Sequence, residues 1–423
     1  MDAGGTMSRL EELIAELCPD GVEYKTLGEV ATISRGGSFQ KKDFLDSGFP
    51  CIHYGQIYTQ YGLFADKTLK FISPVVAEKQ RKAVKNDVVM AVTSENIDDV
   101  CKCLAWLGED EVAVSGHTAI IHHDQNPKYL TYYFHSEMFA AQKRRLAHGT
   151  KVIEVTPDKL NDVKIPLPPL EVQREIVRIL DAYSERVAEL TDRLAAELDA
   201  RKKQYEYYRD DLCNFTNRPD VPFLSVGELF EFKNGLNKGK EFFGKGSPIV
   251  NFTDVFNNRW MTKETLKGLV EVTDKEKELY GAKKNDVFFT RTSETQEEIG
   301  MTSVLLDDIE GCVFSGFVLR ARPKTDLLLP KFCSYYFSSY SMRKDIVRYS
   351  TFTTRALTSG SKLSKLMFPL PPLAEQERIV AILDRFDKLC NDITSGIPAE
   401  IEARRKQYEH YRDRLLTFKE KTA

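Results

Sequence analysis

The stretch PLPPLEVQREIVRILD, which runs from Pro166 to Asp181, recurs as PLPPLAEQERIVAILD from Pro369 to Asp384. The same offset of 203 residues aligns RKKQYEYYRDDL, which begins at Arg201, with RRKQYEHYRDRL, which begins at Arg404. Proline favours an extended chain and is then tolerated in the first turn of a helix. A repeat at a fixed spacing organises a whole fold. The chain is therefore predicted to contain two copies of one unit, each a globular domain followed by a long helix.

Apolar residues along both predicted helices recur at alternating steps of four and three, which is typical of a coiled coil. The helix-pairing and partner-binding candidates in these stripes are Ile176, Leu180, Leu190, Leu194, Tyr205, Tyr208, Ile379, Leu383, Phe386, Tyr408 and Tyr411. Each helix would be roughly 65 Å long, which outruns any one domain. We therefore expect the helices to pair as a spacer and to carry exposed apolar seams near Ile176 and Ile379.

An extra four-residue step interrupts both stripes at the same place. In the second copy the sequence there is Ser395-Gly396-Ile397-Pro398. Because proline disrupts a helix interior, we expect a break near Gly396 and a new helix with Pro398 in its first turn.

The globular regions repeat more loosely. TLGEVATISRGGSF (from Thr26) is similar to SVGELFEFKNGLNK (from Ser225), KNDVVMAVTSE (from Lys85) to KNDVFFTRTSE (from Lys284), and Ser115-Gly116-His117 to Ser315-Gly316-Phe317. Short β-prone runs between Gly, Asn and Asp predict an α+β fold with a curled antiparallel sheet in each domain. The predicted parts are an N-terminal segment (1–20), a first domain (21–165), a central helix (166–213), a second domain (214–368) and a C-terminal helix (369–418) broken near 394–398.

Composition excludes several classes of protein. No run of some 18 apolar residues predicts a membrane span, and residues 1–6 lack the pattern of a signal peptide. Eight scattered cysteines without a C-x-x-C pair are typical of reduced thiols, so we expect a cytoplasmic protein and no metal site. Motifs of nucleotide hydrolysis, amino-methyl transfer and metalloproteolysis are missing, which favours a non-catalytic chain.

The net charge of −3 is unusual for a nucleic-acid-binding protein, but the charge is uneven. Residues 21–165 carry 18 basic and 18 acidic side chains, and residues 221–368 carry 22 and 18. The acidic excess therefore lies in the helices and termini, which leaves the domains free to present basic faces.

The paired PLPPL…Q…IVxILD helices and RKQYExYRD helix ends resemble the specificity subunit of type I restriction–modification enzymes. The opening LEELIAELCPDGVEYKTLGEV is also similar to that family's N-terminus. The resemblance covers nearly the whole chain from about Ser8. In two respects the chain departs from the family: Asn86 and Asn285 stand where a glycine is usual before aspartate, and the first domain is less basic than expected.

The resemblance implies that each domain is a target recognition domain for one half of a split site in double-stranded DNA, and that the two helices pair antiparallel and set the gap. It implies partners that this chain serves as a scaffold: two modification subunits, which methylate adenine with S-adenosylmethionine, and restriction subunits, which use ATP with Mg²⁺. No cofactor is expected in this chain itself.

Phosphate and base contacts need cations, hydroxyls and amides on accessible loops. The DNA-binding candidates in the first domain are Arg35, Ser38, Lys41, Lys42, Thr93, Ser94, Arg145, Thr150 and Lys151. In the second domain they are Lys233, Asn234, Asn237, Lys238, Arg291, Thr292, Ser293, Arg348, Thr353, Thr354 and Arg355. Solvated turns, solvated helix faces and helix caps are the alternative roles for these residues.

Two other functions stay open at this point. A coiled-coil scaffold that assembles proteins without DNA specificity fits the helices equally well, and steeply salt-dependent binding to DNA would argue against it. A nuclease or methyltransferase fragment would need activity in the isolated chain, and the missing motifs argue against that alternative.

Overall fold

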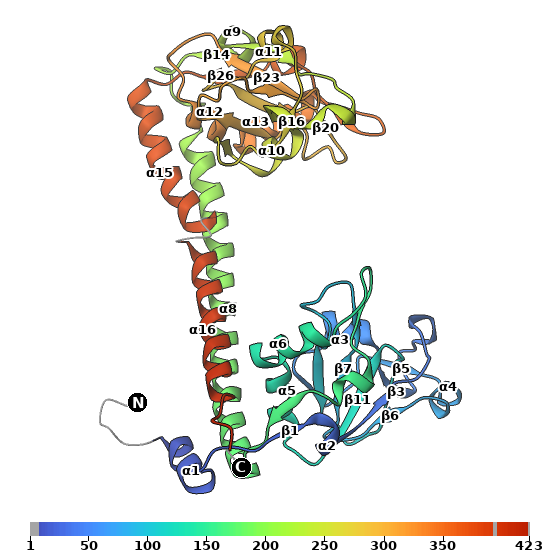
Figure 1. The fold of residues 1–423 in the computed structure, drawn as a ribbon. Helices are drawn as coiled ribbons and strands as arrows, with labels where there is room; N and C mark the ends of the chain where they lie inside the picture. Colours follow the sequence, from blue (N-terminus) through green and yellow to red (C-terminus); the bar gives the residue numbers. More distant parts are fainter. Residues whose placement is uncertain (1–7, 392–395, 422–423) are drawn as a thin grey trace. The chain divides into compact units, whose positions relative to one another are not determined.

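The computed structural model describes residues 8–391 and 396–421 (Figure 1). The chain divides into two compact units. Unit 1 comprises residues 1–193 and 401–423, and unit 2 comprises residues 194–400. The C-terminal end of the chain therefore belongs to the same unit as its N-terminal domain.

Unit 1 is built on two sheets. The larger has the order β2 (Ala31–Arg35), β11 (Thr118–His123), β7 (Val88–Ala91), β9 (Cys103–Trp106), β4 (Phe64–Ala65). The smaller has the order β5 (Lys70–Ile72), β3 (Phe49–Ile52), β10 (Val112–Val114), β6 (Lys82–Ala83). Two further pairs are β1 (Tyr24–Thr26) with β13 (Lys164–Pro166) and β8 (Thr93–Ser94) with β12 (Ile153–Glu154).

Unit 2 repeats this plan. Its larger sheet has the order β15 (Phe230–Asn234), β23 (Val318–Pro323), β19 (Val287–Thr290), β21 (Thr302–Leu305), β17 (Trp260–Met261). One three-stranded sheet has the order β18 (Leu269–Val270), β16 (Phe243–Val250), β22 (Val313–Phe314). The other has the order β20 (Thr292–Ser293), β25 (Ala356–Leu357), β24 (Thr351–Phe352). Strand β14 (Phe223–Ser225) pairs with β26 (Met367–Pro369).

The prediction of an antiparallel sheet is wrong, because the sheets are mixed. Strand β4 runs parallel to β9, and β3 runs parallel to β10. In unit 2, β17 runs parallel to β21, and β16 runs parallel to β22. These strands are two to eight residues long, and nothing in an alternating pattern of that length encodes the direction of the neighbouring strand.

Central strand β7 packs against apolar layers on both faces of the larger sheet of unit 1. Val88 and Met90 belong to the cluster that includes helix α5 (Pro127–Phe134), whereas Val89 and Ala91 belong to the cluster around helix α3 (Tyr54–Thr59). Successive side chains of a strand point to opposite faces, so a strand that is buried on both faces is apolar throughout. The helices that complete the layers are α6 (Glu137–Leu146) in unit 1 and α10 (Phe252–Asn257), α12 (Pro330–Phe337) and α13 (Tyr340–Tyr349) in unit 2.

Helix α8 (Leu170–Leu212) begins in unit 1 and ends in unit 2, and α15 (Leu373–Asn391) and α16 (Ile397–Leu415) follow the second domain. The break expected near Gly396 falls largely on residues 392–395, which lie outside the described residues. Beyond them, α16 has Pro398 in its first turn. None of the helices in the described ranges is long and apolar enough to cross a membrane.

The repeated glutamine fastens each helix to its domain. Gln173 accepts the backbone N–H of Asn126 at 3.1 Å and donates to the Pro168 carbonyl at 2.8 Å. At the same offset of 203, Gln376 accepts the N–H of Leu329 at 2.8 Å and donates to the Pro371 carbonyl at 2.9 Å. Both glutamine side chains are fully buried, where an unmade hydrogen bond is costly.

The aspartate that closes each repeated stretch makes a second clamp. Asp181 pairs with Lys128 at 2.6 Å and accepts the Tyr132 hydroxyl at 2.8 Å. Asp384 makes the same two contacts in unit 2, with the Lys331 amine at 2.6 Å and the Tyr335 hydroxyl at 2.7 Å. The PLPPL…Q…D pattern is thus a docking motif between helix and domain.

The expectation of exposed seams near Ile176 and Ile379 is wrong. Both side chains are fully buried, as are Leu180 and Leu383. The first pair lies in the core of unit 1 and the second pair in the core of unit 2. A buried residue of this size contributes roughly 1.5–3 kcal/mol, so the first turns of each long helix are part of a domain core.

Asn86 and Asn285, where the resemblance led us to expect glycine, have positive φ angles of 76° and 73°. Each residue stands before a buried aspartate, Asp87 or Asp286, whose carboxylate accepts a backbone N–H three residues earlier. Asparagine tolerates this left-handed conformation better than other residues with a β-carbon do. The departures therefore preserve the turn.

Replacing Asn285 tests that explanation. Asn285→Gly should leave the urea midpoint nearly unchanged, whereas Asn285→Ala should lower the free energy of unfolding by about 1 kcal/mol. The neighbouring control Lys284→Ala has an exposed side chain and a negative φ and should be neutral. Unfolding in urea is monitored by circular dichroism. If the Gly and Ala variants are equally stable, the positive φ has no role in stability.

Candidate nucleic-acid interface

Three candidate loops of unit 1 converge at one end of its larger sheet. Arg35, the last residue of β2, forms an ion pair with Glu154 of β12 at 2.9 Å and donates to the Gly116 carbonyl at 2.9 Å. Strand β12 pairs with β8, which contains Thr93 and Ser94. The chain between α6 and β12 carries Thr150 and Lys151, both exposed. The structure thus brings the Arg35, Thr93 and Thr150 regions together.

Not every candidate there is accessible. Thr93 is only 7% exposed, and the Ser94 hydroxyl accepts the Asn96 N–H at 3.4 Å within a local turn. In unit 2, Ser293 is 7% exposed and its hydroxyl accepts the Thr295 N–H at 3.3 Å. These contacts fit the turn-forming alternative, so the serines hold the shape of the loops.

The Ser38–Lys41 segment borders a hollow of about 600 Å³. The backbone N–H of Ser38 donates to the Gln80 side chain at 2.6 Å, which fixes the loop. Lys41 and Lys42 are exposed at the start of a short 3-10 turn (Lys41–Asp43). Because their amines have no ion pair within the described residues, they are the cations of this loop that are available to an anionic ligand.

Six of the unit 2 candidates line two hollows. Lys233, Asn234 and Arg291 line the first. Thr292, Ser293 and Arg355 line the second, together with Phe252 and Phe317. Strand β25 pairs with β20 and with β24. The turn between β24 and β25 carries Thr353, Thr354 and Arg355, all exposed, beside the Arg291 loop.

Lys238 does not fit the role predicted for it. Its amine forms an ion pair with Glu276 at 2.9 Å and lies 4.6 Å from the centre of the Phe242 ring. The side chain is only 15% exposed. Neighbouring Asn237 is exposed. Lys238 therefore anchors its loop to helix α11 (Asp274–Tyr280) instead of facing solvent.

The basic sets on α6 and α13 divide into buried and exposed members. The Lys143 amine donates to the carbonyls of Asp98 and Val100 at 2.7 and 2.9 Å. The Arg343 guanidinium donates at 2.7–2.8 Å to the carbonyls of Glu297, Ile299 and Gly300. Burial lowers the pKa of Arg343 to about 10, which still leaves it charged at neutral pH.

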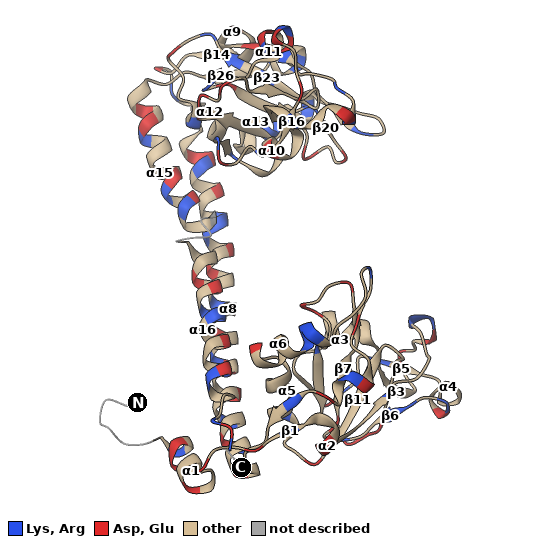
Figure 2. Ribbon diagram, viewed as in Figure 1, with Lys and Arg blue, Asp and Glu red and all other residues tan. Residues whose placement is uncertain are grey.

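Exposed Arg145 and Arg348 lie on the same two helices, and neither has an ion-pair partner in residues 8–391 and 396–421. Figure 2 shows that basic residues on the long helices, by contrast, are interspersed with acidic ones. The free cations of the candidate interface are therefore carried by the domains.

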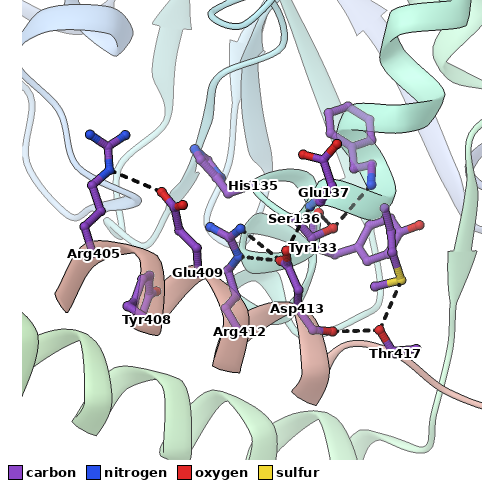
Figure 3. Close-up of polar contacts among 12 residues, drawn as sticks. Tyr133, His135, Ser136, Glu137, Arg405, Tyr408, Glu409, Arg412, Asp413 and Thr417 are labelled. Atoms are coloured by element: carbon purple, nitrogen blue, oxygen red, sulfur yellow. Dashed lines mark hydrogen bonds and ion pairs between the residues drawn. The ribbon is translucent and has the colours of Figure 1, made fainter. Parts of the chain in front are cut away.

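The helix ends that carry the RKQYExYRD pattern also contact the domains. In unit 1, the Asp413 carboxylate faces the start of α6, where it accepts the Glu137 N–H at 3.4 Å, and Arg412 pairs with Asp413 at 2.9 Å (Figure 3). In unit 2, Asp210 accepts the Tyr340 N–H at the start of α13 at 2.9 Å and pairs with Arg209. A carboxylate at a helix N-terminus is favourable because free N–H groups and the helix dipole meet it there.

The remaining helix candidates meet each other through aromatic contacts. The Tyr183 ring of α8 stacks on Tyr408 of α16 at 6.0 Å and meets Tyr411 edge-on at 5.5 Å. In unit 2, Tyr208 stacks on Phe386 at 5.4 Å. Tyr205 is buried and lies 5.0 Å from the Arg259 guanidinium, so it belongs to the core of unit 2. Leu190 and Leu194 are half-buried.

No group of three or more metal-ligating side chains is found in the part of the chain that the structure describes. The eight cysteines are free and buried. Burial raises the pKa of Cys101 to about 12, the opposite of what a metal-binding thiolate needs. Cys101 and Cys103 are therefore part of the hydrophobic core of unit 1.

Sequence reasoning passed over the aromatic side chains that line the hollows, namely Tyr54 and His117 in unit 1 and Phe252 and Phe317 in unit 2. The matched triplets Ser115-Gly116-His117 and Ser315-Gly316-Phe317 carried the signal, because an aromatic ring recurs at their third position.

Arg343 and Arg348 allow a test of which cations are structural. Arg343→Ala removes the donors to three backbone carbonyls, two of them part-buried, and should lower the free energy of unfolding by about 2 kcal/mol. Arg348→Ala, on the same helix but exposed, should leave the melting temperature unchanged. If differential scanning calorimetry shows the two variants equally stable, the buried guanidinium has no structural role.

The chain is similar to known proteins over nearly all of its length. The family model for the type I restriction modification DNA specificity domain matches residues 19–200 and 220–403. The EcoR124I/EcoR124II specificity subunit of Escherichia coli is 31% identical and covers 97% of each chain. A putative type I restriction enzyme specificity subunit of Haemophilus influenzae is 30% identical and covers 94% of this chain and 96% of its own.

Solved structures share the fold at lower identity. A chain from a study of complex assembly and conformational transition of the type I R-M system superposes with a TM-score of 0.68 at 20% identity, over 94% of this chain and 97% of that one. The HsdS subunit from Thermoanaerobacter tengcongensis has a TM-score of 0.53 at 19% identity, over 95% and 96%. With the family match across both halves, these findings lead to one conclusion: the chain belongs to the type I restriction–modification DNA specificity family and is a DNA sequence-specificity subunit.

Proposed function

We propose that the chain recognises a bipartite DNA target through two recognition domains, residues 21–165 and 214–368. The observation that carries this proposal is the duplication itself: each unit presents loops at equivalent positions, with exposed cations that have no ion pair within the described residues. Phosphate contacts from such cations fix the register, and base contacts supply specificity. Two readers on one chain imply a target in two parts separated by an unspecified gap.

In unit 1, the proposed DNA contacts are Ser38, Lys41, Lys42, Arg145, Thr150 and Lys151, together with Arg35, which pairs with Glu154 but, unlike Lys238, is 48% exposed. In unit 2, they are Lys233, Asn234, Asn237, Arg291, Thr292, Arg348, Thr353, Thr354 and Arg355. Four candidates are proposed to stabilise the loops instead of contacting DNA, because their side chains are buried or already bonded within the domain. They are Thr93, Ser94, Ser293 and Lys238.

The two long helices are proposed to pair as an antiparallel coiled coil that spaces the domains. The aromatic contacts support this direction, since residue numbers rise along α8 from Tyr183 to Tyr208 while those of their partners fall from Tyr408 to Phe386. Stripe residues beyond the docked ends, such as Leu190 and Leu194, would form the seam between the helices.

Partner assembly completes the proposed function. The chain is proposed to hold two methyltransferase subunits, which bind S-adenosylmethionine, and to join restriction subunits that use ATP and Mg²⁺, while contributing no catalysis itself. A coiled-coil protein scaffold without DNA specificity is the alternative. The free cations at equivalent loops favour DNA, because a scaffold for proteins has no need of them.

Co-expression with the methyltransferase subunit of its own system, followed by mapping of methylated adenines in host DNA, tests the proposal. A split motif with an unspecified gap is expected. A stable complex that methylates no specific sequence would instead support the scaffold alternative.

Lysine substitutions along α8 test the spacer. Leu190→Lys with Leu194→Lys removes two half-buried apolar side chains, together worth about 2 kcal/mol, and places charges in the seam. Co-purification of the methyltransferase subunit should be lost. Ala188→Lys with Asp192→Lys, on the exposed face of the same turns, is the matched control. Normal assembly of the leucine variant would rule out the coiled-coil spacer.

A further inference from the structure

Each domain has a hollow that is lined by aromatic rings from two equivalent positions, the start of a helix and the turn between two strands. In unit 1 the rings come from Tyr54 of α3 and from His117, between β10 and β11. In unit 2 they come from Phe252 of α10 and from Phe317, between β22 and β23. A single exposed aromatic residue needs no explanation, but its recurrence at one position of a duplicated fold does.

The turns hold these rings at their tips. The Thr118 N–H donates to the Ser115 carbonyl at 3.2 Å, and the Val318 N–H donates to the Ser315 carbonyl at 3.0 Å, which closes each chain reversal. The residue just before the closing N–H, His117 or Phe317, is therefore presented outward, and the Phe317 side chain is 63% exposed.

Hydrogen bonds and ring contacts connect the residues that line each hollow. In unit 1, the Tyr54 N–H donates to the Ser115 hydroxyl at 2.9 Å, and the Tyr54 ring lies 4.9 Å from that of His117. Burial lowers the pKa of the underlying His53 to about 4, so it is neutral at pH 7 and accepts the Gly55 N–H through Nδ1 at 3.1 Å. In unit 2, Phe252 stacks on Phe256 at 5.5 Å.

The chemistry of the two hollows differs. Hollow 1 presents an imidazole, a phenol and the Lys41 amine, all of which form hydrogen bonds. Hollow 2 presents three phenyl rings with Glu294, Glu298 and Arg355 at its edge. Two carboxylates repel phosphate, whereas base edges in the major groove offer amino donors and thymine methyl groups. Although Arg355 attracts phosphate, the two carboxylates and the three phenyl rings favour a base edge over the sugar–phosphate backbone in hollow 2.

We propose that the two hollows contact base edges and that His117 and Phe317 are specificity-determining residues, each for its own half of the DNA target. This inference rests on the proposed bipartite function. The apolar ring of Phe317 contacts a thymine methyl group, and the ring nitrogens of His117 hydrogen-bond to a base edge. The same scaffold position thus recognises different bases in the two domains because the chemistry of the side chain differs.

Exchanging the two side chains tests the proposal. His117→Phe and Phe317→His are made separately in the complex assembled with its methyltransferase subunit. The probes are a duplex with the mapped bipartite motif and a set in which each specified base pair is substituted in turn. Each variant should lose about tenfold in discrimination at one or more base pairs of one half-site, and the two variants should affect opposite halves.

Tyr340→His is the matched control, because Tyr340 is 68% exposed, lies in unit 2 and does not line the hollow. It should keep wild-type discrimination throughout, and melting temperatures should show that all three variants are folded. Unchanged discrimination in both halves, or an equal loss in both, would overturn the inference. A wild-type complex that fails to discriminate the bipartite duplex would instead count against the proposed function, so the two failures are distinguishable.

Discussion

The attachment of each long helix to its domain through a buried glutamine and a clamped aspartate is the constraint on which the rest of the structure depends. Gln173 and Gln376 satisfy backbone groups in a fully buried site, and Asp181 and Asp384 each hold a lysine and a tyrosine. A buried amide without its partners would cost roughly 1–3 kcal/mol, so the helix cannot rotate or slide without breaking the contact. Each domain is thereby fixed on its own helix start.

A second carboxylate makes the attachment two-sided. Asp413 meets the start of α6 in unit 1, and Asp210 meets the start of α13 in unit 2. Each domain is therefore held both by the beginning of the helix that follows it and by the end of the other helix repeat. This arrangement explains why the two sequence patterns are duplicated at one offset: both copies must satisfy the same geometry, whereas the loops between them are free to differ.

The basic residues of the domains fall into two groups, those that bind groups within the domain and those that are exposed to solvent. Lys143 and Arg343 donate hydrogen bonds to backbone carbonyls within the domains, and Lys238 forms an ion pair with Glu276. Lys41, Lys42, Arg145 and Arg348 remain exposed. A sequence pattern shows that a cation is present, but only the packing shows whether buried carbonyls already engage it. For that reason the sequence could propose candidate cations, and the structure then separated the exposed ones from those already engaged.

The sequence by itself determined the duplication, the α+β character of the domains, the long helices and the family, because periodic spacing and a repeated offset are visible along one dimension. It also showed asparagine at 86 and 285 where glycine was expected, and the structure supplied the reason, a positive φ at both positions. Tertiary structure alone decided that the strands run in mixed directions, that Ile176 and Ile379 belong to domain cores, and that aromatic rings from two equivalent positions line a hollow in each domain. The physical reason is that strand direction, burial and convergence of loops depend on contacts between residues far apart in the chain, which no local pattern encodes.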